Sequence, residues 1–252
     1  MNINKSIQEF KLYTSKYDSL DDMIILKINH TFRVMDLCEV LAKSIGLDEK
    51  KIELSKLIGI LHDIGRFEQW KRYKTFSDRE SVDHASLGVE ILKKDNYIRK
   101  YIEDNSYDEL ILKSIYNHNK YILPSDLNEK ELLFSKLIRD ADKIDILYLY
   151  TIKEIELKLD DEAFSEKVYN TLLNKNDVDR KDIKSKTDRL SVPLGFIFDI
   201  NYKKSFEILK ENKYFNIIID QYLNKTDNEV LKNQLEEVRK IINNYIEEML
   251  EC

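Results

Sequence analysis

The sequence contains few residues that interrupt helices, since its 252 residues include only 5 glycines and 2 prolines. Long stretches instead repeat apolar residues at three- and four-residue spacing, and 35% of the residues are charged. This combination predicts an all-α protein, and no segment shows a convincing strand pattern. A chain of this length can bury a full core and form one or two domains.

Cysteine and long apolar runs are scarce as well. Cys38 and Cys252 lack the spacing of a metal site or of a disulfide, which favours a reducing compartment. The first residues contain no apolar run of signal-peptide length, and no segment reaches the ~18 apolar residues of a membrane span. We therefore expect a cytoplasmic protein with no membrane partner.

Positive charge is not concentrated in one part of the sequence. The formal net charge is −6 and the cations are dispersed, so the chain lacks the extended basic face that long nucleic acids require. A small anionic substrate remains compatible with a local positive pocket. The sequence also lacks a G-x-S-x-G string and a P-loop, which argues against serine hydrolase and P-loop chemistry.

One of only four histidines is followed directly by an aspartate, His62-Asp63. Apolar residues at helical spacing precede this pair from about Glu49 onward, and Gly65 is expected to end the helix. Leaving both groups unpaired at a buried helix end would be costly, and a divalent cation would satisfy both. A hydrogen-bonded core histidine beside a capping aspartate is the alternative.

The other three histidines also fall on helices. His30 shares the apolar face of a predicted helix 23–45, His84 follows the capping residue Asp83, and His118 ends a predicted helix that begins at residue 108. Taken alone, each has an ordinary interpretation: a core histidine, a polar surface residue, and a cation at a helix C-terminus.

Two carboxylates interrupt the apolar stripe of a long helix predicted from Glu129. Asp142 is a candidate metal ligand, because an ionised group on a buried face needs a partner. Neighbouring residues that would form ion pairs in this interpretation are Arg139, Asp140, Lys143 and Asp145. With the histidines and Asp63, Asp142 completes a set of nitrogen and oxygen ligands that favours Mn, Fe, Ni or Zn over Ca.

Residues 66–83 lack helical periodicity and predict a loop beside the His62-Asp63 pair. Its cations alternate with aromatic residues, so the loop is either a phosphate-binding segment or a solvated surface. The candidate substrate-binding residues are Arg66, Lys71, Arg72, Lys74 and Arg79.

The sequence suggests a division into a metal-binding helical domain, residues 1–152, and a helical C-terminal extension, residues 153–252. The extension contains predicted helices near 162–174 and at 229–251. Residues 192–206 are unusually apolar, and we expect them to pack the extension onto the first domain.

Four strings in order, HTFRV, LHDIGRF, VDHASLG and RDADKID, resemble the motif blocks of the HD-domain metal-dependent phosphohydrolases. The resemblance covers roughly residues 22–152 and implies a helical bundle. It implies one metal ion held by His30, His62, Asp63 and Asp142. In two-metal members it adds a second ion held by His84 and His118, with Asp63 bridging.

The resemblance also implies hydrolysis of a phosphoester, in a nucleotide or another small phosphorylated metabolite, by metal-activated water. Asp63, His62 and Arg66 are then the candidate catalytic residues. Arg66 stands where many relatives have lysine, and its guanidinium stays protonated, so phosphate binding suits it better than proton donation. The His-His-Glu and Gly-Tyr-Pro strings of cyclic-di-GMP phosphodiesterases are missing.

Two other functions fit the same residues. The first is a non-catalytic protein that senses a metal or a nucleotide, although an open ligand position would give a purely structural site no advantage. The second is a di-iron oxygenase of HD-type fold.

Overall fold

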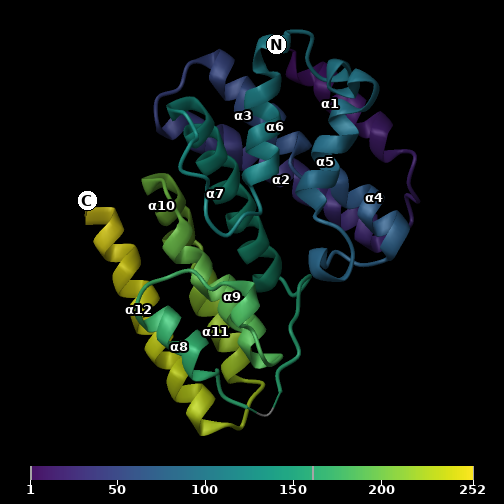
Figure 1. Cartoon of the computed structure of the whole chain (residues 1–252). Helices are drawn as coiled ribbons and strands as arrows, with labels where there is room; N and C mark the ends of the chain where they lie inside the picture. Colours follow the sequence, from purple (N-terminus) through teal and green to yellow (C-terminus); the bar gives the residue numbers. More distant parts are fainter. Residues whose placement is uncertain (1, 161, 252) are drawn as a thin grey trace. The chain divides into compact units, whose positions relative to one another are not determined.

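A computed structural model describes residues 2–160 and 162–251 (Figure 1). Within these residues the regular secondary structure is helical and contains no strand, which confirms the predicted all-α class. The chain divides into two compact units, the first ending at Ala141 and the second beginning at Asp142. This division falls inside one helix, α7, whereas the predicted domain boundary at residue 152 follows the end of that helix.

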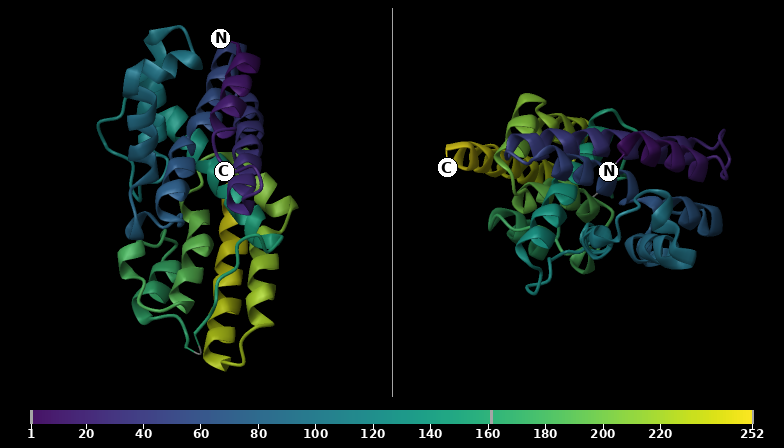
Figure 2. Two further views of the ribbon diagram at one scale, coloured as in Figure 1. Left: turned by 90° about the vertical axis from the view of Figure 1, so that its right-hand side faces the viewer. Right: turned by 90° about the horizontal axis from the view of Figure 1, so that it is seen from above.

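The first unit is built from helices of two to six turns and short 3₁₀ segments. These are α1 (Ile3–Thr14), α2 (Asp22–Ser44), α3 (Glu49–Leu61), α4 (Ile64–Tyr73), η1 (Asp78–Glu80), α5 (His84–Lys93), η2 (Lys94–Lys100), η3 (Asn105–Tyr107), α6 (Asp108–Asn117) and the first part of α7 (Glu129–Thr151). Helices α1 and α2 both pack against α3, and Figure 2 shows these purple and blue helices side by side.

Two capping residues form the connection between α2 and α3. Gly46 adopts a left-handed φ of +72° just after α2 ends, a conformation that glycine reaches without strain. The Asp48 side chain then accepts a hydrogen bond from the Lys51 amide at 3.0 Å and caps α3. The apolar residues Leu54, Ile58 and Leu61 of α3 are all buried.

The predicted end of the helix at Gly65 is wrong, and so is the predicted loop over the first half of residues 66–83. Helix α3 ends at Leu61, and α4 begins at Ile64 and continues to Tyr73. Only His62 and Asp63 separate the two helices. The sequence pattern does not indicate helix α4, because this helix is short and buries few apolar side chains, chiefly Ile64 and Phe67.

Gly65 instead allows two helices to approach each other closely. A Cβ atom built on Gly65 would lie 2.2 Å from the backbone oxygen of His84 and 2.7 Å from the amide nitrogen of Gly88. Small residues follow His84 at the start of α5, and α5 packs against α4. After α5 the chain continues as the 3₁₀ segment η2, which contains left-handed residues at Asp95 and Asn96.

The described residues of the second unit form the rest of α7 and further helical segments. These segments are α8 (Glu166–Leu173), η4 (Arg180–Asp182), η5 (Thr187–Leu190), α9 (Ser191–Gly195), η6 (Phe196–Asp199), α10 (Lys203–Glu211), α11 (Tyr214–Leu223) and α12 (Glu229–Glu251). Helix α12 has the predicted bounds and packs against α8, α10 and α11. That residues 192–206 pack onto the first domain stays a prediction.

Two expectations about the whole chain can be compared with the described residues. None of their helices combines the length and apolarity that a membrane span needs. Cys38 is a buried free thiol in α2, whereas Cys252 lies outside the described residues. The cytoplasmic location stays a prediction.

Candidate metal centre

The four histidines and Asp63 gather in the first unit although they come from separate elements. His30 lies on α2, His84 opens α5, and His118 is the C-terminal cap residue of α6. His62 and Asp63 occupy the break between α3 and α4. All five side chains are buried, none being more than 4% exposed. The cluster is therefore removed from bulk water.

Hydrogen bonds on the outer side of the rings fix which nitrogen faces inward. The Nδ1 atom of His62 lies 2.7 Å from the Gly59 carbonyl, and that of His118 lies 2.6 Å from the Ile115 carbonyl. A carbonyl oxygen only accepts, so both Nδ1 atoms donate, and in a neutral ring with this tautomer the Nε2 atom carries the lone pair. This arrangement is typical of histidines that bind metal through Nε2.

The inward nitrogens approach one another in two pairs. The Nε2 atoms of His30 and His62 are 3.3 Å apart, and those of His84 and His118 are 2.9 Å apart. When Nδ1 donates outward from a neutral ring, the Nε2 lone pair of His62 points at His30, and that of His118 points at His84. A cation between the rings would turn each of these contacts into ligation.

Asp63 lies between the two histidine pairs and turns one carboxylate oxygen toward each. Its Oδ2 atom is 3.5 Å from Nε2 of His30 and 3.6 Å from Nε2 of His62. Its Oδ1 atom is 3.3 Å from Nε2 of His84 and 3.7 Å from Nε2 of His118. The carboxylate is thus placed to share its two oxygens between two ions.

Electrostatics favours the ionised form of Asp63. Burial alone would raise the pKa of this carboxyl group, but Lys27 and the surrounding histidines hold the pKa well below its usual range. The ammonium nitrogen of Lys27 lies 2.7 Å from Oδ2. Asp63 therefore presents a charged carboxylate, the form in which it binds metal.

Three groups of residues offer ligand atoms that all lie within 4.8 Å of one another. They are His30, His62 and Asp63; Asp63, His84 and His118; and His62, His118 and Asp142. Asp142 directly follows Ala141 on α7, the helix that both units share. Asp142 is half-buried, whereas Asp140 and Asp145 are buried but join none of the groups found among the described residues.

An outer carboxylate, Asp78, supports His84. Oδ2 of Asp78 lies 2.7 Å from Nδ1 of His84, and its Oδ1 accepts hydrogen bonds from Arg66 at 2.8 Å and Gln69 at 2.9 Å. Burial opposes the ionisation of Asp78, but His84 and Arg66 lower its pKa. Burial and the charge of Arg66 also lower the pKa of His84, to about 3, so His84 has the neutral ring that a metal ligand needs.

Arg66 lies close to the cluster but is held by α4 and the segment that follows it. Its NH1 group donates to the Phe76 carbonyl at 2.6 Å, as well as to Gln69 and Asp78. Its buried Nε atom has no hydrogen-bond partner among the described residues and lies 3.6 Å from Oδ1 of Asp63. This nitrogen is the part of Arg66 that faces the centre.

The other predicted substrate-binding cations are engaged elsewhere or exposed. Arg72 pairs with Glu68 at 2.7 Å, and Lys74 pairs with Asp21 at 3.2 Å. Lys71 is exposed and lies 6.0 Å from the centre of the Tyr17 ring, and Arg79 is exposed in η1. Substrate contacts from these four residues stay predictions.

Sequence reasoning missed two residues of the centre, Lys27 and Asp78. Lys27 precedes His30 by one helical turn, so the helical spacing that placed His30 inward also places Lys27 on that side. Asp78 precedes His84 by six residues through an irregular segment, and no periodic signal connects them. Its role becomes visible only from the fold.

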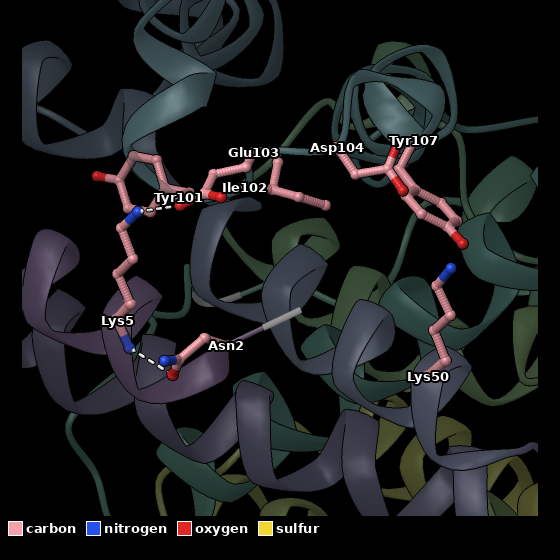
Figure 3. A pocket seen from close by; sticks show the side chains of 8 residues that line it. All are labelled: Asn2, Lys5, Lys50, Tyr101, Ile102, Glu103, Asp104 and Tyr107. Atoms are coloured by element: carbon pink, nitrogen blue, oxygen red, sulfur yellow. Dashed lines mark hydrogen bonds and ion pairs between the residues drawn. The ribbon is translucent and has the colours of Figure 1, made fainter.

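A separate cavity of about 400 Å³ lies between the beginnings of α1 and α3 and the segment from Tyr101 to Tyr107 (Figure 3). Its charged groups are paired locally: Lys5 contacts Glu103 at 2.8 Å, and the Lys50 ammonium lies 5.0 Å from the centre of the Tyr107 ring. None of the clustered histidines lines this cavity, which is therefore distinct from the candidate metal centre.

Comparison with protein families agrees with this geometry. Residues 28–147 match the family model of the HD domain. This part of the chain is similar to the HD domain. The matched residues include all four histidines, Asp63 and Asp142, so the HD domain coincides with the centre described above. Comparisons with curated proteins and with solved structures gave no significant match.

Members of the HD-domain family are largely metal-dependent hydrolases that bind divalent metals. The donors of this centre fit such an ion. They combine inward imidazole nitrogens with a buried, ionised carboxylate, and no thiolate takes part in the ligand groups found among the described residues.

Proposed function

We propose that this protein is a metal-dependent phosphohydrolase of the HD-domain family that cleaves a phosphoester of a nucleotide or another small phosphorylated metabolite. The observation that carries the proposal is the position of Asp63, which directs one oxygen to each pair of histidines. Two ions about 3.5–4 Å apart, sharing such a carboxylate, are the arrangement used to stabilise the attacking and leaving oxygens of a phosphoryl group.

In this proposal His30, His62, Asp63 and Asp142 hold one ion, and Asp63, His84 and His118 hold the other. When bound, the ions supply an activated water at neutral pH and neutralise phosphoryl charge. The protein's own contribution is positional. Outward hydrogen bonds fix the imidazole tautomers, as seen for His62 and His118, and burial keeps competing water away from the ligands.

Charge on the protein supports a phosphorylated substrate. Arg66 presents a buried Nε–H group at 3.6 Å from Asp63 Oδ1 while its NH1 group is held by α4 and the following segment. A donor that is already fixed loses little freedom on binding, and bonds from guanidinium to phosphate are charge-assisted. Arg66 therefore contributes a phosphate contact rather than a transferable proton.

The decisive variant is Asp63→Ala. It should lose bound metal and hydrolysis together while helicity stays unchanged, since Asp63 lies between two helices rather than inside one. Elemental analysis, circular dichroism and a screen of nucleotides and other phosphoesters measure the three properties. Asp126→Ala, which changes an exposed aspartate between α6 and α7, is the matched control. A wild-type metal content in Asp63→Ala would contradict the proposal.

The number of ions is tested separately with the His84→Ala, His118→Ala double variant. Reconstitution with Mn or Fe should give about two ions per wild-type chain and about one in the variant. A wild-type ratio that saturates at one would exclude the second ion. Bound metal without turnover over the whole screen would favour a sensing protein, and oxygen uptake by an iron-loaded sample would favour an oxygenase.

A further inference from the structure

Lys27 places an ammonium group at the edge of the metal centre. Its Nζ atom lies 2.7 Å from Oδ2 of Asp63, and its side chain is only 14% exposed. The same nitrogen lies 5.3 Å from the centre of the Phe76 ring. An aromatic ring and a buried carboxylate thus enclose the ammonium group at the cluster.

Two cations approach Asp63, one at each oxygen. Lys27 contacts Oδ2, and Nε of Arg66 lies 3.6 Å from Oδ1. The Arg66 guanidinium also lies near the Phe76 ring, 5.8 Å from its centre. Arg66 is also paired with Asp78 at 2.8 Å, so the two carboxylates balance the two cations. The side of the centre next to Phe76 nevertheless presents two cationic donors close together, and such donors suit the oxygens of a phosphate anion.

The two cations differ in how firmly they are held. Arg66 is fixed through NH1 by the Phe76 carbonyl, Gln69 and Asp78. The ammonium of Lys27, at the end of a flexible four-carbon stem, has one polar partner within the described part of the chain, Asp63. Lys27 can therefore redirect a hydrogen bond to a bound anion without breaking other contacts of the protein.

We infer that Lys27 is a phosphate-binding residue of this centre, whose ammonium group donates to a phosphoryl oxygen of the substrate. This inference rests on the proposed phosphohydrolase function and names the residue that recognises its substrate class. Lys27 would act together with Arg66: the flexible ammonium follows the phosphoryl group, while the fixed guanidinium Nε defines one side of the pocket.

The test compares Lys27→Met and Lys27→Arg with wild type as full-length, metal-loaded proteins. Inorganic phosphate is the probe, and its Kd is measured by calorimetry. Lys27→Met should retain the wild-type metal content but bind phosphate about 10- to 100-fold more weakly, the size of a lost charge-assisted hydrogen bond. Lys27→Arg should recover part of the affinity, because it restores a cationic donor.

Lys43→Met is the matched control. Lys43 lies on the same helix, is exposed, and pairs with Glu39 on the surface, so its replacement should leave phosphate affinity and metal content unchanged. A lower metal content in Lys27→Met would overturn the inference, because Lys27 would then be only a counter-ion that keeps Asp63 in place. An unchanged phosphate Kd, or a wild type that binds no phosphate, would overturn it too.

Failure of the proposed function has a different signature. If no phosphoester is hydrolysed but phosphate binds the wild type, and binds Lys27→Met more weakly, the anion site stands and the hydrolase proposal falls. If esters are hydrolysed, Lys27→Met should raise KM more than it lowers kcat, as expected for a residue that binds ground state and transition state alike.

Discussion

The Cα atom of Gly65 faces the backbone oxygen of His84 so closely that a Cβ atom there would lie 2.2 Å from it. This contact joins the helix that follows Asp63 to the helix that begins with His84. The distance between the two halves of the candidate metal centre therefore depends on the absence of a side chain at residue 65.

Gly65→Ala should destabilise the protein and disturb the second histidine pair. The obstacle is backbone rather than a flexible side chain, so the helices must separate, and overpacking of this kind costs about 1–3 kcal/mol or more. Urea denaturation gives the free energy of unfolding, and elemental analysis gives the metal content.

Gly88→Ala on the facing helix is the graded control. A Cβ atom there would meet the Ile64 side chain at 3.3 Å and the Gly65 nitrogen at 3.4 Å, contacts that a small shift relieves. Its effect should be the smaller of the two. Equal stability of Gly65→Ala and wild type would show that this close approach is not required.

Periodicity predicted the elements that have a continuous apolar face. Helix α12 begins and ends at the predicted residues, and His30 is buried on the predicted face of α2. The repeat of apolar residues is strong there because one face of each helix packs against its neighbours. Local chemistry was equally informative at Asp83, whose side chain caps α5 as predicted.

The missed features depend on contacts between segments. Helix α4 has too few apolar residues for a periodic signal, and Gly65, a residue that usually ends helices, lies within its first turn because of the packing of α5. Asp78 meets His84 only through the irregular segment between them. Such contacts are determined by the fold rather than by residue spacing, so the sequence could not predict them.

Asp78→Asn should weaken the ion held by His84 and His118. The change keeps the shape of the side chain but removes the charge that accepts the Nδ1 hydrogen of His84. Loss of such an outer partner typically lowers metal affinity 10- to 100-fold. A metal titration should show the second binding step weakened and the first unchanged.

Asp83→Asn is the matched control for this change. Asp83 accepts a hydrogen bond from the Ser86 amide at the start of α5, and asparagine caps helices equally well. Both binding steps should therefore keep their wild-type affinity in this variant. If Asp78→Asn behaves the same way, Asp78 does not support the ligand function of His84.

Arg139→Met should cost about 3 kcal/mol or more of stability. The Arg139 side chain is buried, and its NH1 group donates to the carbonyls of Asn117 and His118 at 3.1 and 3.3 Å. Removing the guanidinium leaves buried carbonyls without a donor, at about 1–3 kcal/mol each. Denaturant unfolding measures the loss, and Lys130→Met, exposed on the same helix, should be neutral.

Arg139 also connects α7 to the end of α6, where His118 is placed. The variant should therefore release the ion held by His84 and His118 before the other ion. Wild-type stability in Arg139→Met would mean that other donors or water satisfy the end of α6.

Arg66→Ala tests whether the fixed guanidinium contacts substrate. With the best substrate found, kcat/KM should fall by an amount equivalent to ~1.5–3 kcal/mol, the range for a lost charge-assisted hydrogen bond. Metal content should not change, because Asp78 keeps Gln69 and His84 as partners. Steady-state kinetics and elemental analysis of the same preparation separate these effects, and Arg180→Ala, exposed in the second unit, controls for a general loss of positive charge. If kcat/KM is indifferent to Arg66→Ala, the Nε–H group beside Asp63 does not face the substrate, and Arg66 serves only to hold Asp78 and the Phe76 carbonyl.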